Sequence, residues 1–139
     1  MSDLADLHRA AFGADGAHGW SPAALRAALD DPSLIVVVHA DAYAIARPIL
    51  DEAELLLIGT RAQARRNGAA TAALAALETS LQARGVAKII LEVAARNAPA
   101  RAFYARHGFR QAGIRQGYYR TEDGTDDAVL LERDLGSAP

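Results

Sequence analysis

Residues 88–109 read KIILEVAARNAPARAFYARHGF, and the pattern in this stretch decides the fold. The apolar run IILEV predicts a buried strand over residues 87–93, and APARAFYARH predicts a short helix over residues 98–107 that stops before a glycine. One carboxylate, Glu92, interrupts the apolar run. Because side chains alternate along a strand, Glu92 lies on the face opposite to the leucine and the valine beside it.

Three polar side chains of this stretch each have a structural and a chemical interpretation. Glu92 is either an exposed residue near the end of the strand, which its position alone favours, or a carboxylate in a cleft that could act as a base. Asn97 is most simply the N-cap of the helix. Tyr104 follows Phe103, and one of the two must pack into the core; a Tyr104 hydroxyl in a cleft would be a proton donor. The local pattern leaves these alternatives open.

The segments before this stretch predict a hairpin, a central strand and a long helix. SLIVVVHA and AYAIARPIL predict strands over residues 33–40 and 42–50, joined as an antiparallel hairpin by a turn near Asp41. EAELLLIGT, residues 52–60, is mostly apolar and is therefore expected to be a central strand. A helix is expected from Asn67 to Arg84. Its buried face is formed by Leu74, Leu77 and Leu81.

Two helices are expected at the start of the chain. The first lies within residues 3–12 and is followed by a loop over residues 13–19. The second begins after Ser21, which is the expected N-cap, and has Pro22 at its first position. Its buried stripe is formed by Leu25 and Leu29.

Two strands are expected at the end of the chain. Residues 109–119 predict a strand followed by a bend, and residues 126–135 predict the last strand. An antiparallel meander that feeds a β-α-β crossover predicts a mixed sheet. The whole chain, residues 1–139, is therefore expected to form a single α+β domain.

The composition narrows the function. The chain has 139 residues and a net charge of −2. It has no cysteine, which excludes a disulfide framework, a thiolate metal site and a cysteine acyl-enzyme. The four histidines show no ligand spacing, so no metal site is expected. Charge and hydropathy predict neither nucleic-acid binding nor a membrane span. The N-terminus lacks the features of a signal peptide, and the cytoplasm is the expected location.

The junction TRAQARRNGAATAAL, residues 60–74, has the features of an anion site. A strand ends, three arginines follow within six residues, and a helix opens with Gly68 and small residues. The free N–H groups and the positive dipole end of a helix start favour phosphate. The alternative is a turn with solvated arginines. No Gly-Lys-Ser/Thr or G-x-G-x-x-G pattern is present, which argues against ATP and NAD.

These motifs together resemble a known family. ARRNGAA has the R-x-x-G-x-A form that resembles the acyl-CoA pyrophosphate loop of the GNAT superfamily of N-acetyltransferases, and ILEVAARNAPARAFYARHGFRQAGIRQGYY resembles the strand, Asn-started helix and GF turn that follow it. Within the superfamily the sequence is most similar to the bacterial ribosomal-protein-alanine N-acetyltransferases (RimI-like). The family has a strand before its first helix and a second loop glycine; here that strand is missing from the pattern and Ala70 replaces the glycine.

The resemblance implies a GNAT fold whose sheet splays between the strands at residues 52–60 and 87–93, with acetyl-CoA in the opening. The backbone groups implied to pair with the pantetheine and polarise the thioester carbonyl are those of Ile58, Gly59 and Thr60. The N–H groups implied to hold the pyrophosphate, with the Arg65 side chain nearby, are those of Arg66, Asn67, Gly68, Ala69, Ala70 and Thr71. Asn97 is implied to contact the cofactor.

The same resemblance implies the reaction. Glu92 is the general base, Tyr104 is the acid that protonates the leaving thiolate, and the acetyl group passes directly to an amine in a ternary complex. The residues implied to lie near the acceptor entrance are Tyr118 and Tyr119. The expected acceptor is the N-terminal α-amine of a protein such as ribosomal protein S18, bound by a monomer or dimer. The alternatives are a small-molecule amine or lysine side chain as acceptor, and a non-catalytic acyl-CoA-binding module.

Overall fold

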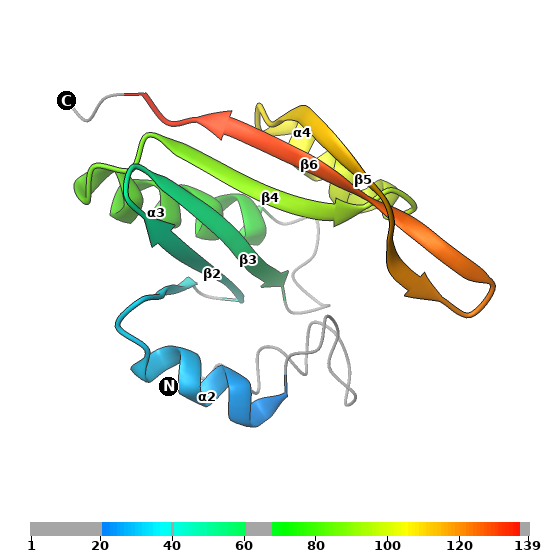
Figure 1. The fold of residues 1–139 in the computed structure, drawn as a ribbon. Coiled ribbons are helices and arrows are strands. Elements are labelled where there is room, and N and C mark those ends of the chain that lie inside the picture. The colour runs from blue at the N-terminus through cyan, green and yellow to red at the C-terminus, as the bar shows by residue number, and fades with distance from the viewer. Residues whose placement is uncertain (1–20, 40, 61–67, 137–139) are drawn as a thin grey trace.

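The computed structural model describes residues 21–39, 41–60 and 68–136, which form one mixed sheet with helices on both faces (Figure 1). The predicted α+β class is confirmed. The elements are α2 (Pro22–Asp30), β1 (Ile35–His39), β2 (Ala42–Ile49), β3 (Glu52–Thr60), α3 (Ala69–Ala83), β4 (Lys88–Ala94), α4 (Ala98–Arg106), β5 (Arg110–Thr121) and β6 (Gly124–Asp134). The helix expected over residues 3–12, the loop over residues 13–19 and the missing first strand fall outside the described residues.

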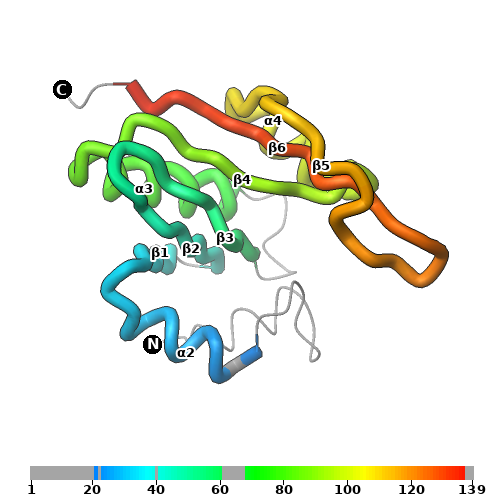
Figure 2. Tube along the Cα trace, viewed as in Figure 1, coloured from blue at the N-terminus to red at the C-terminus, as the bar shows by residue number. Residues whose placement is uncertain are grey.

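The sheet has the order β1-β2-β3-β4-β6-β5. β1, β2 and β3 form an antiparallel meander, as the hairpin pattern predicts, and β3 lies inside the sheet. Helix α3 then crosses over to β4, which runs parallel to β3. This parallel pairing joins only Glu52–Glu54 to Lys88–Ile90, and beyond it the two strands diverge (Figure 2). The splayed sheet that the resemblance implies is confirmed.

The core has two parts, one on each face of the sheet. Helices α3 and α4 cover one face, where Leu74, Leu77 and Leu81 are buried as predicted. Helix α2 covers the other face with Leu25 and Ala28. The prediction that Leu29 is buried is wrong, because its side chain is 52% exposed. The buried stripe of this short helix follows the i, i+3 spacing, which leaves the residue at i+4 outside the contact.

Capping residues set where two of the helices begin. Ser21 Oγ accepts a hydrogen bond from the Ala24 N–H at 3.1 Å, and Asn97 Oδ1 accepts one from the Ala100 N–H at 3.2 Å. Both predicted N-caps are therefore confirmed. The longest described helix, α3, has 15 residues, and no helix in the described ranges has the length and apolarity that a bilayer crossing requires.

The last two strands form a hairpin that extends past the rest of the sheet (Figure 1). The strand expected at the start of residues 109–119 is confirmed, but where the bend was expected β5 continues as a strand to Thr121. The irregularity in this stretch is a bulge: Arg115 pairs with Ala128, and the next registered pair is Tyr119 with Asp126. Two extra residues are thus accommodated in β5, and the Gly117 N–H donates to Asp127 Oδ1 at 2.8 Å. The bulge increases the twist of the strand.

Candidate active site

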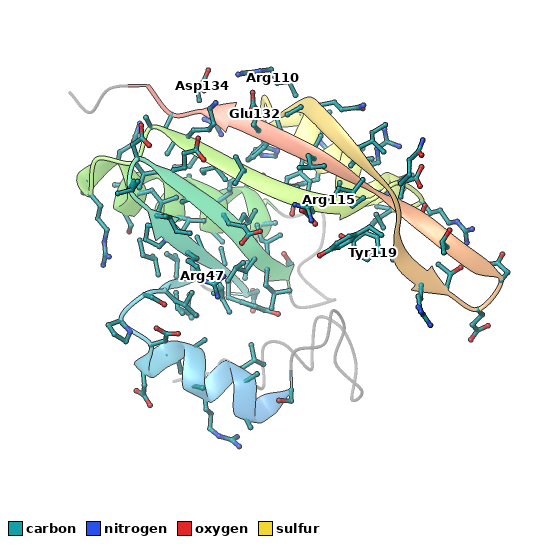
Figure 3. The ribbon with its side chains drawn as sticks, viewed as in Figure 1. Arg47, Arg110, Arg115, Tyr119, Glu132 and Asp134 are labelled. Carbon is teal, nitrogen blue, oxygen red and sulfur yellow. The ribbon has the colours of Figure 1, made fainter. Side chains whose placement is uncertain are left out.

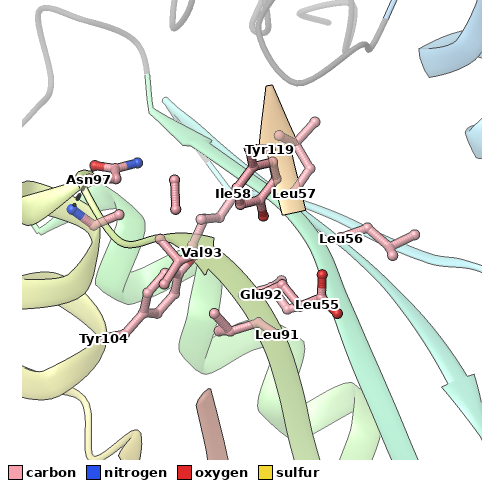
Figure 4. Close-up of a pocket in the computed structure, with 12 residues that line it drawn as sticks. Leu55, Leu56, Leu57, Ile58, Leu91, Glu92, Val93, Asn97, Tyr104 and Tyr119 are labelled. Atoms are coloured by element: carbon pink, nitrogen blue, oxygen red, sulfur yellow. Dashed lines mark hydrogen bonds between the residues drawn. The ribbon is translucent and has the colours of Figure 1, made fainter. Parts of the chain in front are cut away.

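The divergence of β3 and β4 opens the sheet at its centre. Within the described residues, β3 has no strand partner on the β4 side beyond Glu54, and β4 has none on the β3 side beyond Ile90. A cavity of about 290 Å³ occupies this opening (Figure 4). The polar side chains that line it are those of Glu92, Asn97, Tyr104 and Tyr119. Backbone N–H and C=O groups along both strand edges are left for a ligand to pair with.

β3 contains a bulge on its β2 side, opposite this opening. Ile45 pairs with Leu57 while the adjacent Ala46 pairs with Leu55, so Leu56 has no partner in β2. The extra residue reverses the side-chain alternation. Leu55 packs in the core beneath α3, whereas Leu57 packs on the other face, in the cluster that contains Leu25 of α2. Neither the apolar run nor its length predicts the bulge, because leucines suit both faces of a central strand.

The end of β3 is held in place by a tyrosine. Gly59 pairs with Tyr43 of β2, and a Cβ built on Gly59 would lie 2.6 Å from a carbon of the Tyr43 ring. Only glycine therefore lets the fully buried ring pack against this backbone. The structure places Ile58 in the cavity lining, Gly59 beneath the ring and Thr60 at the last position of β3.

Glu92 has the second of the two environments that its position suggests, a cleft rather than an exposed strand end. Its side chain is 20% exposed, and its Oε1 atom lies 3.4 Å from Nε of Arg115 on β5. Because Glu92 pairs with Leu130 and Arg115 pairs with Ala128, two residues along β6, both side chains share one face of the sheet. Glu92 is therefore a partly buried carboxylate with a cationic partner, at the edge of the cavity.

Tyr104 reaches the cavity from the opposite face. It lies on α4, is only 8% exposed, and packs edge-on against Phe109 with 5.4 Å between ring centroids. Burial raises the pKa of its hydroxyl to about 12, so the group is protonated across the neutral range. In the described part of the chain this hydroxyl has no hydrogen-bond partner. A buried donor without a partner, in a cavity wall, is placed to meet a ligand.

Asn97 lies at the end of the cavity where α4 begins. Its Oδ1 atom is occupied by the cap of α4. Its Nδ2 group has no recorded partner within the described ranges and remains a donor in the lining. The structural and chemical interpretations of this residue are thus compatible, because they use different atoms of one amide.

The start of α3 is described from its cap onward. Gly68 has φ +80°, a left-handed conformation that favours glycine, and the first intrahelical bond runs from the Ala72 N–H to the Gly68 carbonyl. The N–H groups of Ala69, Ala70 and Thr71 precede that bond and point out of the helix start. The Thr71 hydroxyl lies 2.9 Å from Nε2 of His107, at the end of α4. The other residues of the expected anion site, Arg65, Arg66 and Asn67, lie outside the described residues.

The two adjacent tyrosines of β5 have different environments. Tyr119 lines the cavity, and its pKa is raised by burial first and by the nearby Glu92 charge second. Tyr118 is 52% exposed, lies outside the lining, and meets Tyr119 edge-on at 5.1 Å between centroids. The guanidinium carbon of Arg115 lies 5.4 Å from the centre of the Tyr118 ring. Arg115 was not among the residues expected at the site, and its one signal in the sequence is the four-residue spacing to Tyr119.

No metal-binding arrangement accompanies these groups. Within residues 21–39, 41–60 and 68–136, no three His, Asp or Glu side chains gather in a way that could hold a metal ion. The chemistry available at the cavity is therefore that of one carboxylate, one guanidinium, two phenols, one amide and unpaired backbone groups. Such a set can accept a proton, donate a hydrogen bond and bind a polar chain along the strand edges.

Comparisons with known proteins agree with this geometry. The model of the acetyltransferase (GNAT) family matches residues 1–109. The ribosomal protein bS18-alanine N-acetyltransferase of Escherichia coli (strain K12) is 44% identical over 90 residues, which cover 65% of this chain and 61% of the relative. The protein of the same name from Haemophilus ducreyi (strain 35000HP) is 38% identical over 91 residues, which cover 65% of this chain and 63% of the relative. The match thus spans about three fifths of the length of these curated relatives.

A solved structure extends the likeness over almost the whole chain. The crystal structure of the ribosomal-protein-S18-alanine N-acetyltransferase from Escherichia coli superimposes with a TM-score of 0.79 at 32% sequence identity. The superposition covers 99% of this chain and 93% of that chain. The shared region therefore includes the cavity between β3 and β4.

Proposed function

The chain belongs to the acetyltransferase (GNAT) family, and from this premise we propose that it transfers the acetyl group of acetyl-CoA to the N-terminal α-amine of a protein. The acceptor we propose is the N-terminal alanine of ribosomal protein S18, because the relatives in the comparisons carry that name. One observation supports the chemistry above all others. A single cavity in the sheet opening has a carboxylate on one face and a protonated phenol on the other.

The cofactor would lie along the open edge of β3. Backbone groups of Ile58, Gly59 and Thr60 would pair with the pantetheine arm, and an N–H of this segment would polarise the thioester carbonyl. The N–H groups at the start of α3 would hold the pyrophosphate, together with the residues of the loop before it. Asn97 would donate its Nδ2 hydrogen bond to the cofactor arm. Support comes from the edge of β3, which is unpaired beyond Glu54 within the described residues, and from the start of α3, where Gly68 supplies no side-chain cap.

Glu92 would act as the base. An α-ammonium has a pKa of about 8, so at neutral pH most of it must lose a proton before the nitrogen can attack a carbonyl carbon. The Glu92 carboxylate, directly or through a water molecule, would take that proton. The nitrogen then bonds to the carbonyl carbon and the C–S bond breaks, so the charge moves to the sulfur on the far side of the carbon.

Tyr104 would stabilise the leaving sulfur. By analogy with cysteine, the thiol of the leaving group has a pKa of about 8.5. This is below the pKa of about 12 that burial gives the Tyr104 hydroxyl. Donation of a hydrogen bond to the developing thiolate therefore costs less than complete proton transfer to it. The hydroxyl is suited to this role because it is protonated, buried and without a recorded partner in the described part of the chain.

The acceptor would enter beside β5. Tyr119 forms part of the cavity wall, and Tyr118 packs against its ring on the outside. Mass spectrometry of three acceptors incubated with acetyl-CoA tests the proposal: a peptide with the S18 N-terminus, an N-terminally blocked peptide with one lysine, and a small amine. Acetylation of the alanine α-amine is the expected result. Transfer to lysine or to the small amine alone would favour the alternative acceptors, and acetyl-CoA binding without any transfer would favour a non-catalytic module.

A further inference from the structure

Arg115 is a charged group beside Glu92 of the cavity lining, and the proposed chemistry leaves it without a role. Its Nε lies 3.4 Å from Glu92 Oε1, its guanidinium carbon lies 5.4 Å from the centre of the Tyr118 ring, and its side chain is 55% exposed. Figure 3 shows Arg115 and Tyr119 extending from β5 on the side that faces the gap between β3 and β4. The group thus lies beside the carboxylate that an acceptor amine would approach.

The strand register fixes this arrangement. Arg115 and Tyr119 pair with Ala128 and Asp126 of β6, which are two residues apart and therefore share a face. The bulge between them is held by the bond from the Gly117 N–H to Asp127. Arg115 is consequently positioned by backbone pairing on both sides of a fixed bulge, which limits the entropy lost when it binds a ligand.

Most of the guanidinium is available to a ligand. An arginine has five N–H donors in a planar fork. Among the residues described, the recorded polar contact of Arg115 is the one from Nε to Glu92. The four N–H bonds on the two terminal nitrogens are therefore free to bind an acceptor oxygen close to the carboxylate.

We propose that Arg115 selects α-amine acceptors by donating a hydrogen bond to the first carbonyl oxygen of the acceptor. In a peptide that carbonyl oxygen lies within about 4 Å of the terminal nitrogen, so an amine at Glu92 brings it to the terminal nitrogens of Arg115. A lysine ε-amine carries four methylene groups instead and has no oxygen within that reach. This inference rests on the proposed function and names the acceptor class of the same site.

The charge of Arg115 acts on both kinds of amine alike. A guanidinium beside the acceptor nitrogen disfavours the ammonium form and so favours loss of its proton. An α-amine with a pKa of about 8 loses that proton more readily than a lysine ε-amine with a pKa of about 10.4. The difference in proton loss therefore comes from the amines themselves, and what Arg115 adds to the selection is the hydrogen bond to the carbonyl oxygen.

A thermodynamic cycle tests the contact itself. Two alanine-starting peptides are compared, one natural and one with its first carbonyl replaced by a methylene group, and kcat/KM is measured for the wild type and Arg115→Gln. For the natural peptide, we expect Arg115→Gln to lower kcat/KM about tenfold. Removal of the carbonyl should lower the kcat/KM of the wild type about tenfold as well. The same removal should lower the kcat/KM of the variant less than about twofold, because the variant has no guanidinium to bind the carbonyl. Each enzyme is compared with itself, so loss of the contact to Glu92 cancels from the ratio.

The control is Arg120→Gln, an exposed arginine of β5 that pairs with Thr125 and so lies on the opposite face from Tyr119. It should reproduce the wild-type values. Arg115→Gln should change kcat/KM little for an N-terminally blocked lysine peptide. The ratio of kcat/KM for the alanine peptide to that for the lysine peptide should therefore fall. If removal of the carbonyl lowered kcat/KM by the same factor in the wild type and in Arg115→Gln, the inference about Arg115 would be overturned, while the proposed function would stand. Failure of the wild type to acetylate either alanine peptide would overturn both.

Discussion

Glu92 and Tyr104 line one cavity from opposite faces of the same sheet. They do so because the β3–β4 pairing ends at Glu54 and Ile90, which leaves an opening through the sheet. A thioester held in that opening would have a proton acceptor on one side and a proton donor on the other. The proton would therefore leave the amine on one face of the sheet, and the thiolate would depart on the other.

Tyr104→Phe separates the role of the hydroxyl from that of the ring. Loss of the donor should lower kcat about 100-fold, while acetyl-CoA affinity stays close to that of the wild type. The free energy of unfolding should change little, because the ring keeps its packing against Phe109 and the hydroxyl has no recorded partner in the described residues. Steady-state kinetics and urea unfolding measure the two effects. A variant with wild-type kcat would exclude the phenol from the reaction.

Burial of Tyr104 should make the protein less stable at alkaline pH. Burial raises the pKa of Tyr104 from 10.0 to about 12. Between these values the unfolded state has released a proton that the folded state still holds, so the free energy of unfolding falls as pH rises, by about 2 to 3 kcal/mol in total. Tyr104→Phe should be less sensitive to alkali when unfolding is compared at about pH 9 and about pH 11.5. Equal alkaline losses in both proteins would show that Tyr104 ionises without resistance in the folded state.

Gly59→Ala tests the contact that holds the end of β3. The added methyl group would lie 2.6 Å from the Tyr43 ring, so we expect a loss of about 1 to 3 kcal/mol in the free energy of unfolding. Gly113→Ala is the matched control on β5, where the added Cβ would meet Leu130 at an ordinary 3.8 Å. Chemical denaturation of both variants measures the difference. Similar stability for the two would mean that Tyr43 moves freely away from β3.

Asn97 has two roles that substitutions can separate. Asn97→Asp keeps the capping oxygen for the Ala100 N–H but removes the Nδ2 donor, so it should retain stability and weaken acetyl-CoA binding. Asn97→Ala should also lose about 1 kcal/mol of stability, because the cap is removed. Calorimetric titration with acetyl-CoA and thermal unfolding report on the two effects. Unchanged acetyl-CoA affinity in Asn97→Asp would assign the residue to the cap alone.

Local rules were sufficient for most of the fold. Ser21 and Asn97 are N-caps, and Leu74, Leu77 and Leu81 are buried, because capping chemistry and hydrophobic spacing act over a few residues. Glu92 and Tyr104 were candidates by position, but the pattern alone favoured an exposed Glu92. The family resemblance was needed to connect them, since their common cavity depends on where two strands stop pairing.

Other features depend on contacts that no local pattern contains. The β3 bulge at Leu56 reverses which leucine faces α2, and a run of leucines carries no sign of it. Leu29 is exposed because the short α2 contacts the sheet through Leu25 and Ala28. Arg115 reaches Glu92 through the register of β4, β6 and β5, which is a property of three strands together.

The most direct test of the central claim is the turnover of Glu92→Gln with acetyl-CoA and a peptide that begins with the S18 alanine. The matched control is Glu54→Gln, a carboxylate of β3 that pairs with Arg47 and lies outside the cavity lining. The predicted result is a loss of about 100-fold or more in kcat for Glu92→Gln, with acetyl-CoA affinity retained and the control unchanged. Acetylation of that peptide by Glu92→Gln at the wild-type rate would contradict the assignment of Glu92 as the base.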